Sequence, residues 1–290
     1  MEALRASYGD SSSDSDTDDL SPAVSASANS GEKSIAGRES ISLPPPPLDL
    51  LDSIGSTGSV DFYSTEPGVR VRNFPHVDGN YALHVYIPVS IPLLPKKEIV
   101  YFLKRVASVV PHLHLVEADV PLSILCKDEQ KLEHALGREF HISLGRSVPL
   151  RVHQINSVVS LLRQKLQFQK RYWIDFNKWE GFVNDDCTRS FLSLEITTSG
   201  LSEISKQIDA VNEVYKLHNL PEFYKDPRPH ISLVWALGDI RTSLKGAVDR
   251  ELRKLRAGDC VQNRIFTSKF GGIICKIGNK THKICNLPDE

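Results

Sequence analysis

The sequence lacks the features of several common protein classes. No apolar run approaches the roughly 18 residues that a membrane-spanning helix needs. The chain begins without the basic start and apolar stretch of a signal peptide. Five cysteines are present, an odd number, and they form no C-x-x-C pair: Cys126, Cys187, Cys260, Cys275 and Cys285. We therefore expect an intracellular protein with reduced thiols and no membrane attachment.

Signature motifs of nucleotide and metal chemistry are absent too. The sequence contains no P-loop, no G-x-G-x-x-G loop and no H-E-x-x-H pair. Of the ten histidines, His112 and His114 would face the same way in a strand. Such a pair without a third ligand at an evident spacing is a weak indication of zinc. We expect no metal and no cofactor.

Charge is distributed unevenly along the chain. The first 60 residues hold ten acidic and three basic residues, a net of −7, whereas the whole chain carries −1, so the remainder carries +6. Residues 1–65 are rich in Ser, Asp, Gly and Pro, and they cannot bury enough apolar surface to offset chain entropy. We predict a disordered acidic Ser/Pro-rich tail over 1–65. The folded domain over 66–290 is moderately basic, which suits an anionic ligand.

What the sequence does contain is one four-residue motif twice, His141-Ile142-Ser143-Leu144 and His230-Ile231-Ser232-Leu233. Each copy lies in a short apolar run with turn-prone or charged flanks, which predicts a strand. Successive side chains of a strand face opposite sides, so His and Ser share one face of each copy. A chance repeat with structural histidines is the alternative. The helix-like stretch that follows each copy favours a catalytic pair.

The hydrophobic pattern around the motifs predicts an α+β fold. Alternation predicts strands over 81–89, 172–176 and 191–196, and turns are expected at 177–181 and 184–186. Helical spacing of apolar residues predicts helices over 96–110, 155–166, 201–215 and 244–255. A closing hairpin is expected to turn at Gly278-Asn279. Strands and helices alternate in two halves with one motif each, which predicts two lobes with a groove between them.

Two histidines and two serines suit phosphodiester transesterification. One neutral imidazole would remove a proton from a 2′-hydroxyl, and one imidazolium would protonate the leaving oxygen. An ordinary His pKa of about 6.5 allows both states near neutral pH. Ser143 and Ser232 would donate hydrogen bonds to the non-bridging phosphate oxygens. A Ser-His-Asp hydrolase is not excluded by spacing, but each Ser lies beside its His rather than in line as nucleophile and base. The need for a 2′-hydroxyl predicts RNA as substrate.

The segment before the second motif predicts a rigid loop, because it contains Pro227 and Pro229. This loop could hold Tyr224 at the mouth of the groove, where an aromatic ring stacks on a base. Packing of Tyr224 against the core is the alternative. Arg228 and Lys225 either contact phosphate or are ordinary loop charges. Structural or surface roles are expected for six other histidines: His76, His84, His134, His153, His218 and His282.

These motifs together resemble the U6 small nuclear RNA phosphodiesterase family of the 2H phosphoesterase superfamily. The two His-x-Ser motifs have their histidines 89 positions apart. Three further segments carry the resemblance: 70–76, 223–233 and 275–280. The resemblance runs from about residue 69 to the C-terminus.

The resemblance implies a fold and an activity. The fold would be the two-lobed 2H phosphoesterase fold, with two antiparallel sheets forming a central groove, helices packed outside and a pseudo-twofold axis. The activity would be that of a nuclear, metal-independent 3′-to-5′ exoribonuclease that trims the oligouridine tail of U6 RNA. Its product would end in a 2′,3′-cyclic phosphate or a 3′-phosphate. We expect RNA as partner and a monomer.

Carried over by position, the resemblance also implies roles for residues. His141 would be the base toward the 2′-hydroxyl, and His230 the acid toward the leaving 5′-oxygen. Ser143 and Ser232 would hold the phosphate. Contacts to the base or nucleotide would come from three residues of the loop before the second motif: Tyr224, Asp226 and Arg228.

Two alternatives of other kinds remain open. One is a 2′,3′-cyclic phosphodiesterase that acts on small nucleotides or transfer RNA ends, and it would leave uridine-ended RNA uncut. The other is a nucleotide- or RNA-binding module without catalysis. The presence of both His and both Ser in intact motifs argues against that module.

Overall fold

The computed structural model describes residues 77–116, 118, 120–256 and 264–288. These residues lie within one compact unit that runs from Phe62 to Glu290. The predicted tail over 1–65, the predicted start of order near residue 69 and Cys260 lie outside the described residues.

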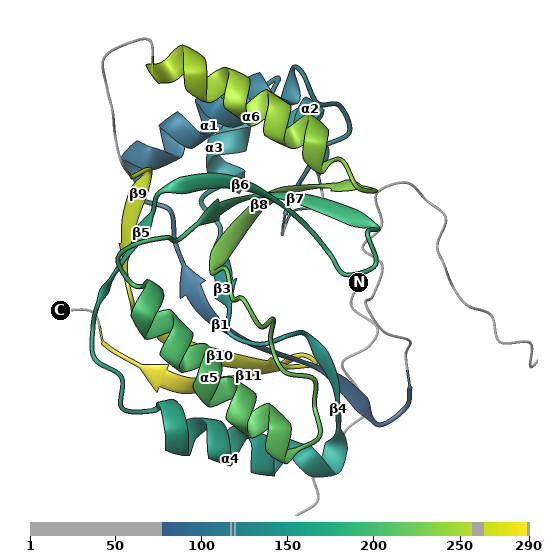
Figure 1. The fold of residues 1–290 in the computed structure, drawn as a ribbon, viewed down its shortest axis with the longest axis vertical. Helices are drawn as coiled ribbons and strands as arrows, with labels where there is room; N and C mark the ends of the chain where they lie inside the picture. The colour runs from purple at the N-terminus through teal and green to yellow at the C-terminus, as the bar shows by residue number, and fades with distance from the viewer. Residues whose placement is uncertain (1–76, 117, 119, 257–263, 289–290) are drawn as a thin grey trace, which may run out of the picture. The chain divides into compact units, whose positions relative to one another are not determined.

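Sheet A carries the first motif. Its strands have the order β11-β10-β1-β3, and β4 also pairs with β1; every pair is antiparallel. The strands are β1 (Asn80–Val89), β3 (Phe140–Ser143), β4 (Val148–Arg151), β10 (Gly272–Ile277) and β11 (Lys280–Asn286). Buried and partly exposed residues alternate along β1, so one face of sheet A enters the core. Helix α4 (Ile155–Leu166) packs against β10 and β11, and α5 (Leu201–Leu217) packs against α4 (Figure 1).

Sheet B carries the second motif and is also antiparallel, with the order β2-β8-β7-β6. Its strands are β2 (His114–Leu115), β6 (Lys178–Val183), β7 (Arg189–Glu195) and β8 (His230–Leu237). Helix α6 (Arg241–Arg256) packs against β6 and against α1 (Leu93–Ala107). The rings of Phe102 on α1 and Trp179 on β6 stack with centroids 4.2 Å apart. Apolar burial of this kind holds the helices on sheet B.

The remaining elements are short. They are α2 (Leu122–Leu125), α3 (Glu129–Ala135), the 3₁₀ helix η2 (Val152–Gln154) and the antiparallel strand pair β5 (Trp173–Phe176) and β9 (Phe266–Lys269). Helices α2 and α3 are too short for a periodic apolar pattern to predict them.

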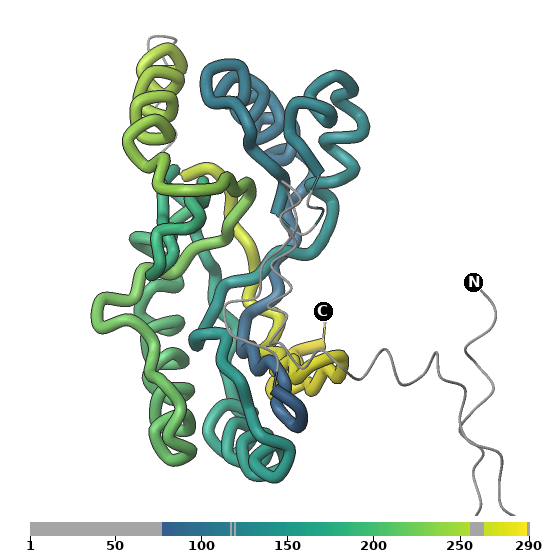
Figure 2. Tube along the Cα trace, turned by 90° about the vertical axis from the view of Figure 1, so that its right-hand side faces the viewer, coloured from purple at the N-terminus to yellow at the C-terminus, as the bar shows by residue number. Residues whose placement is uncertain are grey.

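Each lobe is assembled from distant parts of the chain, as the colours of Figure 2 show. Strand β1 lies in sheet A, the next helix α1 packs with α6 beside sheet B, and β10 and β11 return to sheet A at the other end of the chain. The expected division into two halves of the sequence is therefore wrong, although each motif does lie in its own sheet. The reason is that β1 pairs with β3 on one side and with β10 on the other.

Most predicted elements are confirmed, and one turn is wrong. Helix α4 spans the predicted residues 155–166, and the closing hairpin turns at Gly278, whose φ is +55°. The turn expected at 177–181 is mostly strand, because β6 begins at Lys178. The side chain of Asn177 accepts hydrogen bonds from the backbone N–H and the hydroxyl of Thr197. The bend at Asn177 leads from β5 into sheet B instead of closing a hairpin.

Two further properties follow from the described ranges. No helix in them combines the length and apolar character that a membrane span requires. Their four cysteines, Cys126, Cys187, Cys275 and Cys285, are free thiols.

Candidate active site

The two repeated motifs meet where β3 of sheet A contacts β8 of sheet B. The predicted alternation is confirmed: the isoleucines of both motifs are fully buried, whereas both histidines and both serines are partly exposed. His141 and His230 are close enough for the charge of His141 to lower the pKa of His230. Two imidazoles and two hydroxyls therefore face one site, which we call the histidine site.

A third histidine supports the first motif. His84 on β1 has its Nε2 3.0 Å from the Oγ of Ser143, and its ring meets that of His141 edge-on at 4.8 Å. Tyr86, two residues further along β1, lies opposite Ser143 in the strand register. Its ring is 5.5 Å from His141. The expectation that His84 is structural or on the surface agrees with its partial exposure, and the structure adds the contact with Ser143, which the strand alternation of 81–89 could not predict.

The second motif is held by different groups. The Oγ atoms of Ser232 and Ser193 on β7 lie 3.0 Å apart. The ring of Phe182 on β6 stacks on His230, with centroids 3.9 Å apart and planes 13° from parallel. The Nδ1 of His230 is 2.7 Å from the carbonyl oxygen of Arg228. A carbonyl only accepts, so Nδ1 carries a proton and Nε2 is the nitrogen that can exchange one. Burial lowers the pKa of His230.

A cluster of charges lies beside His230 on the same face of sheet B. The guanidinium of Arg228 donates to both carboxylate oxygens of Glu195, at 2.6 and 2.8 Å, and is 3.1 Å from Glu180. Burial raises the pKa of Glu195, but hydrogen bonds from Arg228 and Lys178 outweigh it and bring that pKa below its ordinary value. Glu195 lies opposite His230 in the register, and its charge opposes the effect of burial on the His230 pKa. Arg228 thus has two carboxylate partners, and its contact with a nucleotide stays a prediction.

Tyr224 lies in the loop before β8 and is 44% exposed. The guanidinium of Arg146, two residues after the first motif, lies 4.1 Å from the centre of the Tyr224 ring. Arg146 also forms an ion pair with Asp185. Burial, together with the charge of Asp185, raises the pKa of Tyr224, so the phenol stays neutral. Asp226 is exposed in the same loop, and within the described ranges its carboxylate joins no hydrogen bond or ion pair of the histidine site.

Sequence reasoning missed several residues of the site. His84, Phe182, Ser193 and Glu195 reach the motifs only through strand pairing or ring contact. Only Arg146 had a local signal, because it follows the first motif closely. A repeated motif identifies its own residues, but the residues that contact the motif depend on the fold.

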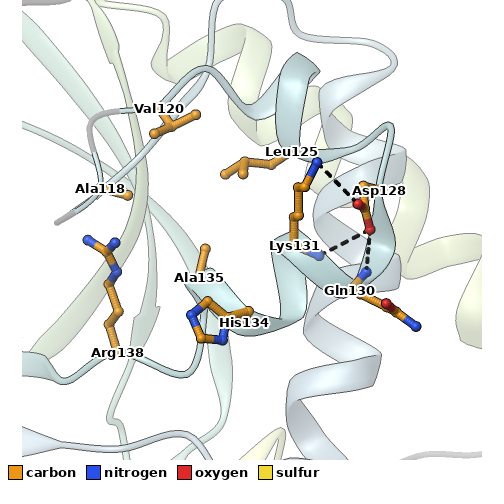
Figure 3. A pocket seen from close by; sticks show the side chains of 9 residues that line it. All are labelled: Ala118, Val120, Leu125, Asp128, Gln130, Lys131, His134, Ala135 and Arg138. Carbon is orange, nitrogen blue, oxygen red and sulfur yellow. Dashed lines mark hydrogen bonds and ion pairs between the residues drawn. The ribbon is translucent and has the colours of Figure 1, made fainter.

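A separate cavity of about 430 Å³ lies beside α2 and α3 (Figure 3). The carboxylate of Asp128 in its wall caps α3 by accepting from the backbone N–H groups of Gln130 and Lys131. The cavity contains no residue of either motif. Across the residues that the structure describes, no group of three or more His, Cys, Asp or Glu is arranged to hold a metal ion.

Two antiparallel sheets, each with a His-x-Ser strand at the histidine site, define the 2H phosphoesterase fold. A sequence-family model named HVSL, described as "Uncharacterised conserved protein", matches residues 44–285. The curated U6 snRNA phosphodiesterase 1 of Homo sapiens is 35% identical over 220 residues, covering 75% of this chain and 74% of the relative. The relative of the same name from Xenopus laevis is 32% identical over 248 residues, covering 84% and 90%. The chain belongs to the U6 small nuclear RNA phosphodiesterase family, which confirms the resemblance.

Solved structures with a similar fold are more distant. Kluyveromyces marxianus Usb1 with uridine monophosphate has a TM-score of 0.47 and 10% sequence identity, covering 71% of this chain and 98% of that chain. Escherichia coli LigT complexed with 3′-AMP has a TM-score of 0.41 and 11% identity, covering 70% and 94%. At these scores the likenesses carry no argument about individual residues.

Proposed function

We propose that this protein is a 3′-to-5′ exoribonuclease that trims the uridine-rich 3′ end of U6 small nuclear RNA in the nucleus. The observation that carries the proposal is the meeting of His141 and His230 at one site, each with a serine on the same strand face. Family membership supports the substrate, because the curated relatives carry the name U6 snRNA phosphodiesterase 1. The chemistry below uses side chains only, and we propose that it needs no metal.

The reaction is an internal transesterification. One imidazole removes the proton from the 2′-hydroxyl of the penultimate nucleotide, and that oxygen attacks the neighbouring phosphorus. The bond from phosphorus to the 5′-oxygen of the terminal nucleoside breaks, and the second imidazole, as imidazolium, protonates that oxygen. The RNA is shortened by one residue and ends in a 2′,3′-cyclic phosphate. Ser143 and Ser232 donate hydrogen bonds to the non-bridging oxygens, where charge develops.

The structure bears on which histidine is the base. The family resemblance implies His141 as base and His230 as acid. Burial lowers the pKa of His230, and the charge of His141 acts in the same direction. The lowered pKa favours a neutral His230, and the contact of its Nδ1 with the carbonyl of Arg228 leaves Nε2 able to accept a proton, which supports the reverse order. We propose His230 as the base through Nε2 and His141 as the acid.

The terminal base is proposed to stack at Tyr224. The ring is exposed, and the guanidinium of Arg146 beside it is a second flat group on which a base can stack. Asp226 and Arg228 remain proposed nucleotide contacts of lower importance, because Asp226 is exposed and Arg228 is held by carboxylates.

The first test is a time course on 5′-labelled and 3′-labelled oligouridine RNA with chelator present. Wild type should shorten the RNA stepwise from its 3′ end. His141→Ala and His230→Ala should each lower the rate by about 10²- to 10⁴-fold, whereas the control His153→Ala, at an exposed position, should not. RNA that is bound but left intact would contradict the proposal, and cleavage of small cyclic phosphates alone would favour the alternative enzyme. If chelation abolished cleavage and a divalent ion restored it, the metal-free mechanism would be contradicted.

A second substrate separates the two histidines. When sulfur replaces the bridging 5′-oxygen, the leaving group no longer needs a proton. The variant that lacks the acid should then regain activity, while the variant that lacks the base should not. Rescue of His141→Ala supports the order proposed here, and rescue of His230→Ala supports the order that the resemblance implies.

A further inference from the structure

We propose that one face of sheet A binds the RNA backbone upstream of the cleaved phosphate, chiefly through Lys276 and Lys283. This inference rests on the proposed function, because it extends the same substrate from the same site. This face carries His84, His141 and Ser143, and we call it the open face. Its residues on β1, β3, β10 and β11 are partly or fully exposed: His84, Tyr86, Pro88, His141, Ser143, Ile274, Lys276, Thr281 and Lys283.

The strand register connects the histidine site to the two lysines. Ser143 pairs with Tyr86, Tyr86 with Ile274, and Ile274 with Lys283. These four residues form one row across sheet A. Three strand spacings of about 4.8 Å place the Cα of Lys283 roughly 14 Å from that of Ser143. In the adjoining row Lys276 is the partner of His84 and Thr281 is the partner of Lys276.

The direction of the RNA follows from the two edges of sheet A. Arg146 follows β3 at one edge and contacts Tyr224, where the terminal base is proposed to bind. Lys276 and Lys283 lie on β10 and β11, toward the opposite edge. Ser143 is on the edge strand β3 and Arg146 is three residues after it, whereas the two lysines are two and three strands away. A strand whose last base is at Tyr224 and whose phosphate is at Ser143 therefore continues over β1, β10 and β11.

Charge favours the same path. Lys276 and Lys283 are exposed, and the open-face positions of these four strands, all of them described, include no carboxylate. At the histidine site sheet B presents Glu180 and Glu195, whose charges are balanced by Arg228 and Lys178. Cations that neutralise phosphates supply most of the affinity for a nucleic-acid backbone. A polyanion should therefore bind more tightly over sheet A than over sheet B.

The row between Ser143 and Lys283 is suited to a base. Tyr86 and Ile274 are partly exposed and lie side by side in it. Aromatic side chains beside a basic path are the usual arrangement for single-stranded RNA, because every base has a face that stacks. The open face thus offers a ring next to the cleaved phosphate and cations beyond it.

The test measures binding separately from cleavage. Fluorescent oligouridines of two, five and twelve nucleotides are titrated against the full chain carrying His141→Ala and His230→Ala, at several salt concentrations. Affinity should rise with length. Adding Lys276→Gln and Lys283→Gln should reduce the ratio of dodecamer to dinucleotide affinity by roughly tenfold. It should also lower the salt slope by about 0.7 for each phosphate that is no longer neutralised.

The matched control replaces two other exposed cations. Lys97 lies on α1 and Lys245 lies on α6, both exposed and outside sheet A. Lys97→Gln with Lys245→Gln removes the same charge and should leave the length ratio as it is. Thermal unfolding of each variant checks that it is folded.

The outcomes separate this inference from the proposed function. A length ratio that is the same with and without the two lysines overturns the inference, whether or not wild type cuts RNA. Lysine-dependent binding of the dodecamer by a wild type that leaves it uncut supports the binding surface and overturns the exonuclease. Absence of binding to every oligouridine overturns both.

Discussion

The same four residues, His-Ile-Ser-Leu, are held differently in the two sheets. In sheet A the hydroxyl of Ser143 contacts an imidazole, that of His84, at 3.0 Å. In sheet B the hydroxyl of Ser232 contacts another hydroxyl, that of Ser193, also at 3.0 Å. A neutral imidazole nitrogen can donate or accept, and its state changes with pH, whereas a serine hydroxyl does not titrate in this range. The two serines that we propose to bind phosphate are thus equivalent in position but have chemically different partners.

The two histidines differ in the same way. His141 meets the edge of another imidazole, while Phe182 covers one face of His230 and burial lowers its pKa. Glu195 and Arg228 form an ion pair beside His230, whereas the open face of sheet A has exposed lysines. A transesterification needs one base and one acid at the same pH. The difference between the sheets places the two imidazoles of the repeated motif in different surroundings.

Apart from the histidine variants, the largest effect is expected when either serine loses its hydroxyl. Ser143→Ala and Ser232→Ala should each lower the single-turnover rate by about 10²- to 10³-fold, because each removes one donor to the developing charge. Ser160→Ala, at an exposed position of α4, is the control. A large effect at one serine and none at the other would contradict the equivalent positions of the two serines, because only one sheet would then hold the phosphate.

Loss of the ion pair beside His230 should destabilise sheet B. Arg228→Met leaves Glu195, which is 4% exposed, without its strongest partner. The free energy of unfolding should fall by about 1–3 kcal/mol, a range reduced for the solvent exposure of Arg228. Lys178→Met, at a more exposed cation on the same carboxylates, should lose less than about 1 kcal/mol. Chemical denaturation measures the stability of both variants. Equal losses of stability would contradict the assignment of Arg228 as the stronger partner of Glu195.

The stability difference between wild type and Arg228→Met should depend on pH with a defined sign. The pKa of Glu195 is lowered in the folded protein. Its contribution is therefore fully present above the ordinary Glu pKa of about 4.3 and is lost as pH falls through the lowered value. The two unfolding free energies should converge in acid. A difference that stays constant to low pH would show that the Glu195 charge is not involved.

Glu195→Gln should move one limb of the pH–rate profile. The charge of Glu195 raises the pKa of His230, so its removal lowers that pKa further. The limb that belongs to His230 should shift to lower pH by roughly one unit, while the limb of His141 stays. Glu98→Gln, at an exposed position of α1, is the control. A shift of both limbs would mean that the two imidazoles titrate as one coupled pair.

The smallest effect is expected at the ring over His230. Phe182→Leu removes the stacked ring and opens that face to water, so the pKa of His230 should rise toward its ordinary value. The His230 limb should then shift upward, opposite to the shift expected for Glu195→Gln. Stability should fall by about 0.5–1.5 kcal/mol. Phe168→Leu, at a residue 87% exposed, controls for the loss of an aromatic ring. A downward shift of the limb would contradict burial as the cause of the lowered pKa.

The local elements and the motif residues could be predicted from the sequence alone. Alternation placed His141 and Ser143 on one strand face, and spacing of apolar residues predicted α4 at its observed bounds. Both signals are local, because the side-chain periods of strands and helices are properties of the backbone. A repeated motif can also be recognised in a sequence without a structure. The two histidines could therefore be identified before the distance between them was known.

The residues that surround the two histidines depend on the tertiary fold and could not be predicted. His84 reaches Ser143 from 59 positions away, and the expected turn at 177–181 is instead the start of β6. Periodicity tells which side chains of a strand share a face, but it does not tell which strand lies beside it. Strand pairing joins distant segments, and here it interleaves the two lobes. The lowered pKa of His230 arises from those neighbours, because burial and nearby charge set a pKa, and both depend on the fold.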